Sequence, residues 1–263
     1  MGRALELVSV QATAPGAGGA AGAAVAGNSL TIRDTRKPAR IVALWGDRQG
    51  VGGVRLTSPL LHDTTFGMGS FQSGGEAVSI FPAGQPVQAQ DTITATVTGS
   101  ATAGDIEQSS FLVSYDDLPG VEGRFFSPAQ IRARMVNLFT TINTVTTGAT
   151  GGYSGSEAVN AETDAFKANT DYALIGAAVY LNAACSIRFD GPDWGNLGVG
   201  VPGFLNVSNG LDLMWWFWYL SEVTGLPLIP VMNASNKGLT NISALQDENG
   251  ADPVVVTQWA ELR

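Results

Sequence analysis

The residues of this sequence that could carry out chemistry are few, and the first to test is its single histidine. His62 is followed by Asp63 and comes four residues after Ser58, so the residue types of a hydrolytic triad occur in one short segment. A triad needs groups that converge from separate segments, and no G-x-S-x-G nucleophile elbow occurs. We therefore expect no catalytic residues and predict that the protein is not an enzyme.

Metal and cofactor sites are not expected either. One cysteine, Cys185, and one histidine cannot form a conventional zinc site, and no calcium-loop motif occurs. The glycines of 195–200 follow Pro192-Asp193-Trp194 and precede Pro202, so they lack the strand-turn-helix context of a dinucleotide loop and indicate tight β turns. Cys185 is expected to be a small buried hydrophobe, and we expect no cofactor.

Two further clusters have a functional and a structural interpretation. Asp116-Asp117 could be an acid/base pair, but a solvated strand end is the favoured interpretation. The aromatic run at 215–219 could stack on sugars. On a helix, however, its side chains point in all directions, which is typical of an element buried against the second sandwich or against a neighbouring subunit.

The composition excludes one class of partner. The chain has 263 residues and a formal net charge of −9, which argues against sequence-specific nucleic-acid binding because such binding needs clustered Lys and Arg. Charged residues make up 14%, against about 25% in an average soluble domain. So little charge indicates a surface that neighbouring subunits cover in part.

Membrane and export signals are not expected. The N-terminal residues lack a signal-peptide core, and position 6 is not the Ser or Thr of a myristoylation motif. The apolar run 211–220 is about half of a bilayer span and contains Asp212, so it is not expected to cross a membrane.

Residues 1–28 are predicted to form a flexible N-terminal arm, because 12–29 are poor in bulky side chains. Residues 29–126 then give short β-like stretches separated by turn residues, which predict a first jelly roll. The predicted strands are 30–33, 40–45, 54–57, 77–81, 92–98 and 109–115.

The segment 127–165 is predicted to be a helix and a linker. Ser127, Pro128 and Gln130 form a capping-box start, and apolar residues at 131, 135, 138, 139 and 142 follow at helical spacing, so the helix should end near 146–148. The Gly/Ser/Thr-rich stretch 147–156 is interpreted as a linker or an exposed loop.

Residues 166–263 are predicted to form a second jelly roll. Its expected strands are 171–180, 186–190, 197–201, 228–232, 239–245 and 254–261. A helix is expected at 209–224, with Ser208 or Asn209 as its cap and Gly225 after its end.

The two halves resemble each other, which favours two tandem domains. The segment 54–59 aligns with 187–192, and 41–44 aligns with 174–177, both at an offset of 133. Near the ends, 112–118 aligns with 256–262 at an offset of 144. The extra residues of the second copy coincide with the helix at 209–224, so we predict an insertion there.

These features together predict an all-β fold with a few helices, built as two tandem jelly-roll β-sandwiches. Over residues 29–263 this architecture resembles the double jelly-roll major capsid proteins of tailless icosahedral bacteriophages with an internal membrane. Members usually carry a helix in each roll before its last strands, whereas the first roll here has only the Gly- and Pro-rich 72–90 at that place.

The resemblance implies a viral structural protein located in the virion and assembled in the host cytoplasm. Both rolls would stand perpendicular to the shell, and three chains would form a pseudo-hexagonal homotrimeric capsomer. The implied partners are other copies of the chain, vertex or penton proteins and the internal membrane, which the arm could face. Loops 47–53 and 147–156 are candidates for the outer surface or for contacts between capsomers.

Three alternatives remain open. A carbohydrate-binding β-sandwich would use Trp194 or the aromatic run at 215–219. A hydrolase would need acids that converge from distant strands. A tail, spike or vertex protein would differ from a major capsid protein only in its assembly geometry.

Overall fold

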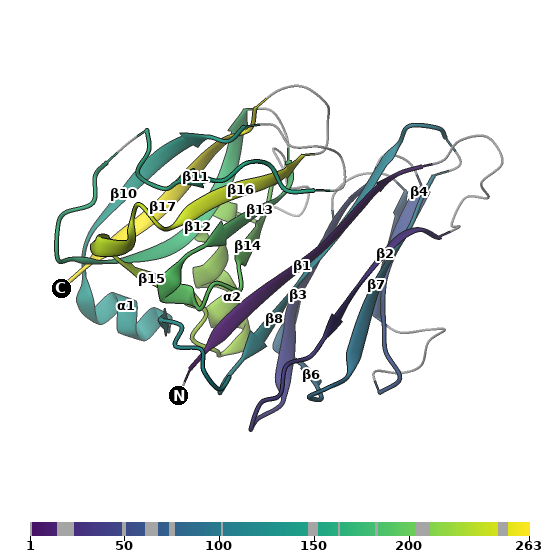
Figure 1. Ribbon diagram of the computed structural model, residues 1–263, viewed down its shortest axis with the longest axis horizontal. Helices are drawn as coiled ribbons and strands as arrows, with labels where there is room; N and C mark the ends of the chain where they lie inside the picture. The colour runs from purple at the N-terminus through teal and green to yellow at the C-terminus, as the bar shows by residue number, and fades with distance from the viewer. Residues whose placement is uncertain are drawn as a thin grey trace.

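The computed structural model describes residues 2–14, 24–48, 51–60, 68–73, 77–100, 102–146, 152–162, 164–181, 184–203, 211–246 and 252–263. Most of these residues lie in strands, which form four antiparallel sheets with a few short helices. Figure 1 shows two sandwiches side by side, the first in purple and blue and the second in green and yellow. The predicted all-β fold is confirmed.

The first sandwich contains eight strands: β1 (Ala4–Thr13), β2 (Ala24–Thr31), β3 (Ala39–Arg48), β4 (Val51–Thr57), β5 (Met68–Ser73), β6 (Ala77–Val87), β7 (Thr92–Thr98) and β8 (Ile106–Tyr115). One sheet has the order β1-β8-β3-β6, and the other has the order β2-β7-β4-β5. Strand β7 alternates between outward threonines and the buried Ile93, Ala95 and Val97, as the sequence predicts for a half-exposed strand.

The second sandwich contains β10 (Met135–Thr144), β11 (Glu157–Ala158), β12 (Asp171–Leu181), β13 (Ala184–Asp190), β14 (Val199–Pro202), β15 (Ile229–Asn233), β16 (Asn241–Gln246) and β17 (Val254–Leu262). Its sheets have the orders β10-β17-β12-β15, extended by β9 (Phe125–Phe126), and β11-β16-β13-β14. The helices are α1 (Pro128–Arg134) and α2 (Trp216–Thr224), with single turns η1 (Pro192–Trp194), η2 (Leu213–Trp215) and η3 (Ala234–Asn236).

Both sandwiches use the same strand order. Counted within each sandwich, the first, eighth, third and sixth strands face the second, seventh, fourth and fifth, which is the two-sheet, eight-strand arrangement of a jelly roll. The segments aligned at the sequence level lie on equivalent strands: β3 with β12, β4 with β13, and β8 with β17. The predicted insertion also holds, because α2 lies between the fifth and sixth strands of the second sandwich.

A β-bulge occurs at the same place in both halves. The register of β3 on β8 shifts between Ile41 and Ala43, and that of β12 on β17 shifts between Leu174 and Gly176. The extra residues, Val42 and Ile175, are equivalent under the alignment of these two strands. After the bulge, Ala43 pairs with Leu112 and Gly176 pairs with Gln258. Leu112 therefore corresponds to Gln258. The sequence alignment instead pairs Leu112 with Val256, which lies two residues earlier and on the same face of the strand.

The prediction of a flexible arm over 1–28 is wrong for residues 4–13 and 24–28, which belong to β1 and β2. Strand β1 pairs with β8 along its whole length, and Leu5 and Ala4 are fully buried. Both faces of β1 are covered, since Val8 and Val10 belong to the first core while Leu5 faces the second sandwich. Residues 15–23, the centre of the small-residue segment, lie outside the described residues.

The predicted helix from 128 to about 146 is correct only for its first two turns. Ser127 and Gln130 form the capping box, and α1 ends at Arg134. The chain then continues as β10, which pairs with β17. Val136, Thr140, Thr141 and Ile142 are β-branched and favour a strand, and pairing with β17 outweighs their helix-like spacing. The second sandwich consequently begins at 135 and includes most of the segment predicted to be a linker.

Helix α2 lies between the sandwiches (Figure 1), where it contacts β6 of the first and β12 of the second. The Asp212 side chain accepts a hydrogen bond from the backbone N–H of Met214 in η2, and Gly225 adopts the left-handed conformation predicted for the helix end. Ser208 and Asn209 lie outside the described residues. Within the described part of the chain, no helix is long and apolar enough to cross a membrane.

Candidate interaction surfaces

The two sandwiches meet along a continuous contact, named here the seam, between the outer face of the β1-β8-β3-β6 sheet and the second sandwich's β13, β14 and α2. The backbone N–H of Leu7 donates to the carbonyl of Gly198 at 3.2 Å. Gly200 faces the Leu7 side chain so closely that a Cβ there would lie 2.7 Å from it. The rings of Trp45 and Trp216 meet edge to face with centroids 5.7 Å apart. The seam is therefore packed as tightly as a core.

The centre of the seam is polar. The Ser9 hydroxyl lies 2.6 Å from that of Ser110 and 2.8 Å from that of Tyr153, and Tyr153 donates to Ser186 at 3.2 Å. Burial raises the pKa of the Tyr153 phenol, and the hydrogen bonds to Ser186 and Ser9 oppose this rise. Such bonds orient the two sandwiches because buried polar groups must keep their partners.

Tyr153 corrects the interpretation of 147–156 as an exposed loop. Its hydroxyl lies in the seam, and Ser154 is buried where it bonds the backbone of Ala244 in β16. Residues 147–151 lie outside the described part. The other predicted outer loop, 47–53, is in large part strand. Residues 47–48 belong to β3, and residues 51–53 belong to β4.

Cys185 is a buried small residue, as predicted. It is fully shielded from solvent, and the side-chain amide of Gln11 in β1 donates to its Sγ at 3.4 Å across the seam. The thiol therefore takes part in joining the sandwiches.

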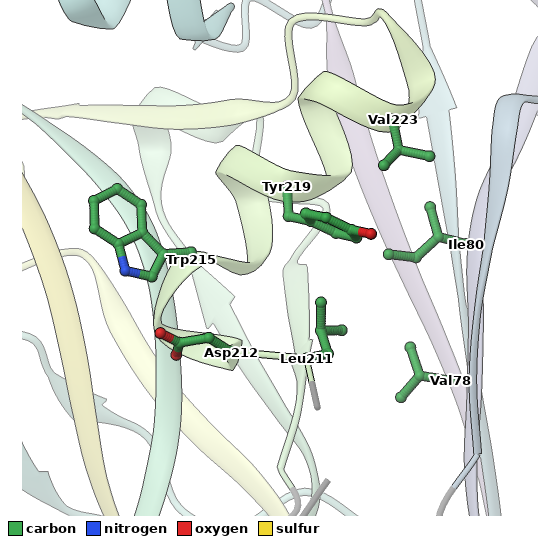
Figure 2. Close-up of a pocket in the computed structure, with 7 residues that line it drawn as sticks. All are labelled: Val78, Ile80, Leu211, Asp212, Trp215, Tyr219 and Val223. Atoms are coloured by element: carbon green, nitrogen blue, oxygen red, sulfur yellow. The ribbon is translucent and has the colours of Figure 1, made fainter. Parts of the chain in front are cut away.

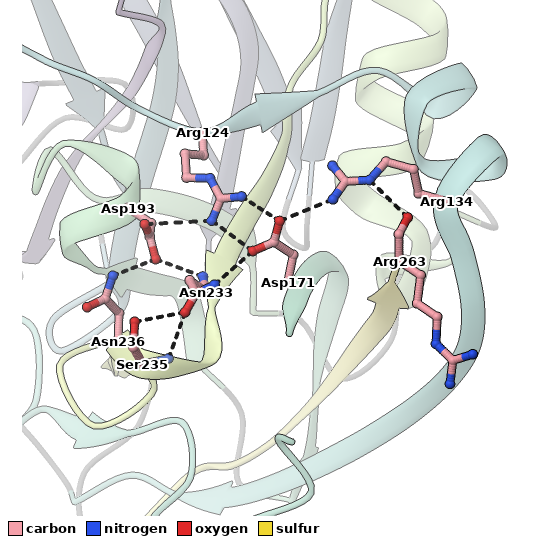
Figure 3. Close-up of polar contacts among 8 residues, drawn as sticks. All are labelled: Arg124, Arg134, Asp171, Asp193, Asn233, Ser235, Asn236 and Arg263. Atoms are coloured by element: carbon pink, nitrogen blue, oxygen red, sulfur yellow. Dashed lines mark hydrogen bonds and ion pairs between the residues drawn. The ribbon is translucent and has the colours of Figure 1, made fainter. Parts of the chain in front are cut away.

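A network of charged and polar side chains anchors the segment that connects the two sandwiches to the second sandwich (Figure 3). Arg124, which lies between β8 and β9, makes two hydrogen bonds of 3.1 and 2.6 Å with the carboxylate of Asp171 at the start of β12. Arg134, at the end of α1, adds a third bond of 3.2 Å to that carboxylate. Burial alone would raise the pKa of Asp171, but the bonds from Arg124, Asn233 and Arg134 lower it below its ordinary value.

The network continues through Asp193 at the centre of η1. Its Oδ2 accepts 2.8 Å bonds from the backbone N–H of Asn233 and the side chain of Asn236, while its Oδ1 lies 3.9 Å from Arg124 (Figure 3). Arg134 also donates to the carbonyl of Arg263 at the chain end. Through the two carboxylates of Asp171 and Asp193, these bonds hold η1, the end of β15 and the end of the chain in place.

An apolar groove opens between the first sandwich and α2 (Figure 2). It has a volume of about 480 Å³ and is lined by Val78, Ile80, Leu211, Asp212, Trp215, Tyr219 and Val223. Val78 and Ile80 come from β6, and the remaining residues come from α2 and the chain that leads into it. Trp215 is 37% exposed and Tyr219 is 46% exposed, so both rings can be reached by a ligand.

Part of the aromatic run at 215–219 is buried, and part of it is exposed. Trp216 and Phe217 are fully buried, and the indole of Trp216 donates to the carbonyl of Gly200 at 2.9 Å. Tyr219 points toward Ile80 of β6, whereas the indole of Trp215, which also lines the groove, points away from β6 (Figure 2). Trp194, the other aromatic residue considered for sugar binding, is 1% exposed and cannot stack on a ligand in this structure.

Strands β10 and β17 lie on the side of the second sandwich away from the first (Figure 1), and their outer face carries exposed apolar side chains. Strand β10 is the edge of its sheet. Leu138 is 37% and Ile142 is 46% exposed, and the cross-strand neighbour of Ile142, Val256, is half-buried. An apolar stripe of this kind on an edge strand is typical of a protein contact surface.

Only some of the residues first considered for chemistry belong to the described part of the chain. His62 and Asp63 lie outside the described residues, and Ser58 donates to Asp91 at 2.6 Å. Asp116 follows the end of β8 and pairs with Arg3 at 2.7 Å, whereas Asp117 is buried rather than solvated. Of the glycines at 195–200, Gly195 and Gly198 adopt the left-handed conformation of tight turns, whereas Gly200 lies in β14 and pairs with Arg188.

Several carboxylates that the hydrolase alternative could use form ion pairs instead, and Glu6 is an example. Glu6 accepts from Arg33 at 2.6 Å and from the Tyr115 hydroxyl at 2.8 Å, and this burial beside Glu6 raises the pKa of Tyr115. Among the described residues, no group of three or more His, Cys, Asp or Glu is placed to hold a metal ion.

Sequence reasoning missed the seam, the charged network and the uncovered face. Leu5, Leu7 and Ser9 alternate with Val8 and Val10, a two-faced strand pattern that could have marked β1 as buried on both sides. The network combines residues more than 100 positions apart, for which the sequence carries no local signal.

Comparisons with known proteins identify no family, since no family model and no curated protein matches the chain. Solved structures that resemble it include the PBSX exported protein XepA, with a TM-score of 0.28, 10% identity and coverage of 97% of this chain and 86% of that one. The major capsid protein P2 of bacteriophage PM2 has a TM-score of 0.22 and 9% identity, with coverage of 99% of this chain and 98% of that one. Peptide:N-glycanase F has a TM-score of 0.23 and 10% identity, with coverage of 98% of this chain and 96% of that one. With TM-scores this low, these likenesses carry no argument about function.

We expect Asp171→Asn to lower the free energy of unfolding by about 1–3 kcal/mol at pH 7, because it leaves Arg124 and Arg134 without their carboxylate. The folded-state pKa of Asp171 lies below its unfolded value, so this stabilisation is complete above about pH 4 and is lost as the pH falls through the folded pKa. Urea unfolding followed by circular dichroism at pH 7 and in a series towards pH 3 measures it.

The matched control is Asp164→Asn, which removes a more exposed carboxylate paired with Lys237 and should change the stability far less. Equal losses in the two variants, or a loss for Asp171→Asn that does not shrink towards acid pH, would contradict the role given to Asp171.

Proposed function

We propose that this chain is a phage structural protein, the major capsid protein of an icosahedral virion, and not an enzyme. Three copies form a homotrimeric capsomer of pseudo-hexagonal outline, in which each chain supplies two jelly rolls. The partners in this proposal are other copies of the chain, vertex or penton proteins and an internal membrane. The particle assembles in the host cytoplasm.

The observation that carries the proposal is the pairing of two sandwiches of identical strand order through a tightly packed seam. A chain built in this way is a rigid block with two similar units, each offering flat sheet faces and end loops for contacts with neighbours. Closed symmetric assemblies need such repeated, self-complementary surfaces.

The weakly charged surface supports the same proposal. Charged residues make up 14% of the chain, and threonines line the outward side of β7. Charged residues are depleted at the centres of protein interfaces, because burying them without partners is costly.

We predict that the purified chain forms stable trimers or closed shells. Light scattering after size-exclusion chromatography measures the mass, and electron microscopy of the same sample shows the outline. Three chain masses with a pseudo-hexagonal outline, or icosahedral particles, would support a major capsid protein. Fivefold-symmetric oligomers, or isolated fibres, would indicate a vertex or spike protein instead. A monomer at all concentrations would contradict the proposal.

The groove favours one second candidate, a carbohydrate-binding module. Trp215, Tyr219 and Asp212 all line the groove, and the two rings are partly exposed. Rings of this kind stack on sugars, and a carboxylate accepts hydrogen bonds from hydroxyl groups. If this candidate holds, a glycan array gives a specific signal that Trp215→Ala removes and Tyr180→Ala keeps. Tyr180 is 68% exposed and does not line the groove. An array without signal would exclude the glycans tested.

A further inference from the structure

A second cavity opens at the end of the first sandwich where the chain leaves β8. It has a volume of about 370 Å³, and the loop that follows β8 forms most of its wall. The connection between β2 and β3 adds Arg36, and the residue before β1 adds Gly2. Three charged side chains line the cavity, namely Arg36, Asp117 and Glu122. It therefore differs from the groove beside α2, whose walls are mainly apolar.

The wall of this cavity is fixed in position. A 3.3 Å backbone hydrogen bond from Val121 to Leu118 closes a turn. Pro119 stands at its second position and Gly120, with a φ of 76°, at its third, which is the residue pattern that type II turns favour. The N–H of Leu118 donates to the carbonyl of Gly2 at 2.8 Å, and a Cβ on Gly2 would lie 1.2 Å from the carbonyl oxygen of Val121. The cavity is thus preformed.

Asp117 is the residue that indicates a ligand. It is only 8% exposed, yet it lines the cavity. Within the described part of the chain, no hydrogen bond or ion pair reaches its carboxylate. The adjacent Asp116, by contrast, pairs with Arg3 at 2.7 Å. Burying a carboxylate without a partner is costly, so an unsatisfied carboxylate at the wall of a cavity points to a ligand that supplies the partner.

The charges and walls of the cavity favour an organic cation. Asp117, Glu122 and Arg36 together carry two formal negative charges and one positive, which leaves −1 for a single cation to neutralise. A Ca²⁺ ion would need about six to eight oxygen ligands, whereas no group of three or more His, Cys, Asp or Glu among the described residues is placed to hold a metal. Leu118 and Val121 instead offer aliphatic surface, on which the stem of a basic side chain packs.

We propose that this cavity binds a guanidinium or primary ammonium group carried on an aliphatic stem, as in an arginine or lysine side chain or a free alkylamine. The cation pairs with the carboxylate of Asp117, and Glu122 adds a second, exposed carboxylate. Such charge-assisted hydrogen bonds are the strong ones. The exposed Arg36 can donate to a backbone carbonyl when the ligand is part of a peptide. The site does not require the chain to assemble, so it stands apart from the proposed function.

Calorimetric titration of the full chain with butylguanidine at low salt is the first test, and butylurea is the uncharged probe of the same shape. We expect saturable binding of butylguanidine and none of butylurea. Asp117→Asn should raise the dissociation constant at least about tenfold, because the ion pair is lost. Asp164→Asn removes an exposed carboxylate outside the cavity and should leave the constant unchanged. Equal binding of butylurea, or unchanged binding by Asp117→Asn, would overturn the proposal.

Stability provides a readout that does not depend on the probe. Asp117→Asn removes a buried charge that has no partner, so the melting temperature of the unliganded variant should equal or exceed that of the wild type. A clear fall would show that the carboxylate has a structural role and would overturn the proposal. Glu122→Lys is the second variant, because it places an ammonium group at the cavity from an exposed position. It should abolish binding of butylguanidine and leave the melting temperature unchanged.

Nα-acetyl-arginine methylamide distinguishes the two sources of the cation. If the site takes a protein side chain, this probe binds more tightly than butylguanidine, and Arg36→Gln weakens only the binding of the peptide-like probe. If the site takes a free alkylamine, both probes bind equally, and Arg36→Gln strengthens both because a like charge is removed. Either pattern supports a cation site at Asp117. Absence of saturable binding for both probes would overturn it.

Discussion

The rest of the structure depends on the burial of the β1-β8-β3-β6 sheet on both faces. Phe111 and Val113 of β8 point into the first core, while Leu112 between them belongs to the core cluster shared with the second sandwich. Along β1 and β8 this sheet has no water-facing side, which explains why β1 carries apolar residues on both of its faces, with Val8 and Val10 on one and Leu5 and Leu7 on the other. The second sandwich is thus part of the hydrophobic environment of the first.

The polar groups in the seam determine how the two units are oriented. Apolar contact alone tolerates sliding, because it is non-directional. The hydroxyl cluster around Tyr153 and the bond from Gln11 to Cys185 are satisfied only in one arrangement. On the other side of the connection, the three bonds from Arg124 and Arg134 to Asp171 hold the entry into the second sandwich. A fixed angle between repeated units is what a building block for a symmetric assembly needs.

Local patterns allowed prediction of the fold class, most strands and the duplication, because alternation and turn residues are read over a few positions. They failed where tertiary pairing decides. The apolar residues of 131–142 fit a helix by spacing, yet β17 offers the segment from Met135 onward a complete set of backbone partners. The apolar groove and the Asp171 network could not have been found in this way, because each joins elements that are distant in the sequence.

The central claim is that the seam joins the two sandwiches into one cooperative unit, and differential scanning calorimetry tests it most directly. A single transition is predicted, with a calorimetric enthalpy equal to the van't Hoff enthalpy for the whole chain. Two resolved transitions, or a van't Hoff enthalpy well below the calorimetric value, would show that the sandwiches unfold independently and would contradict the account.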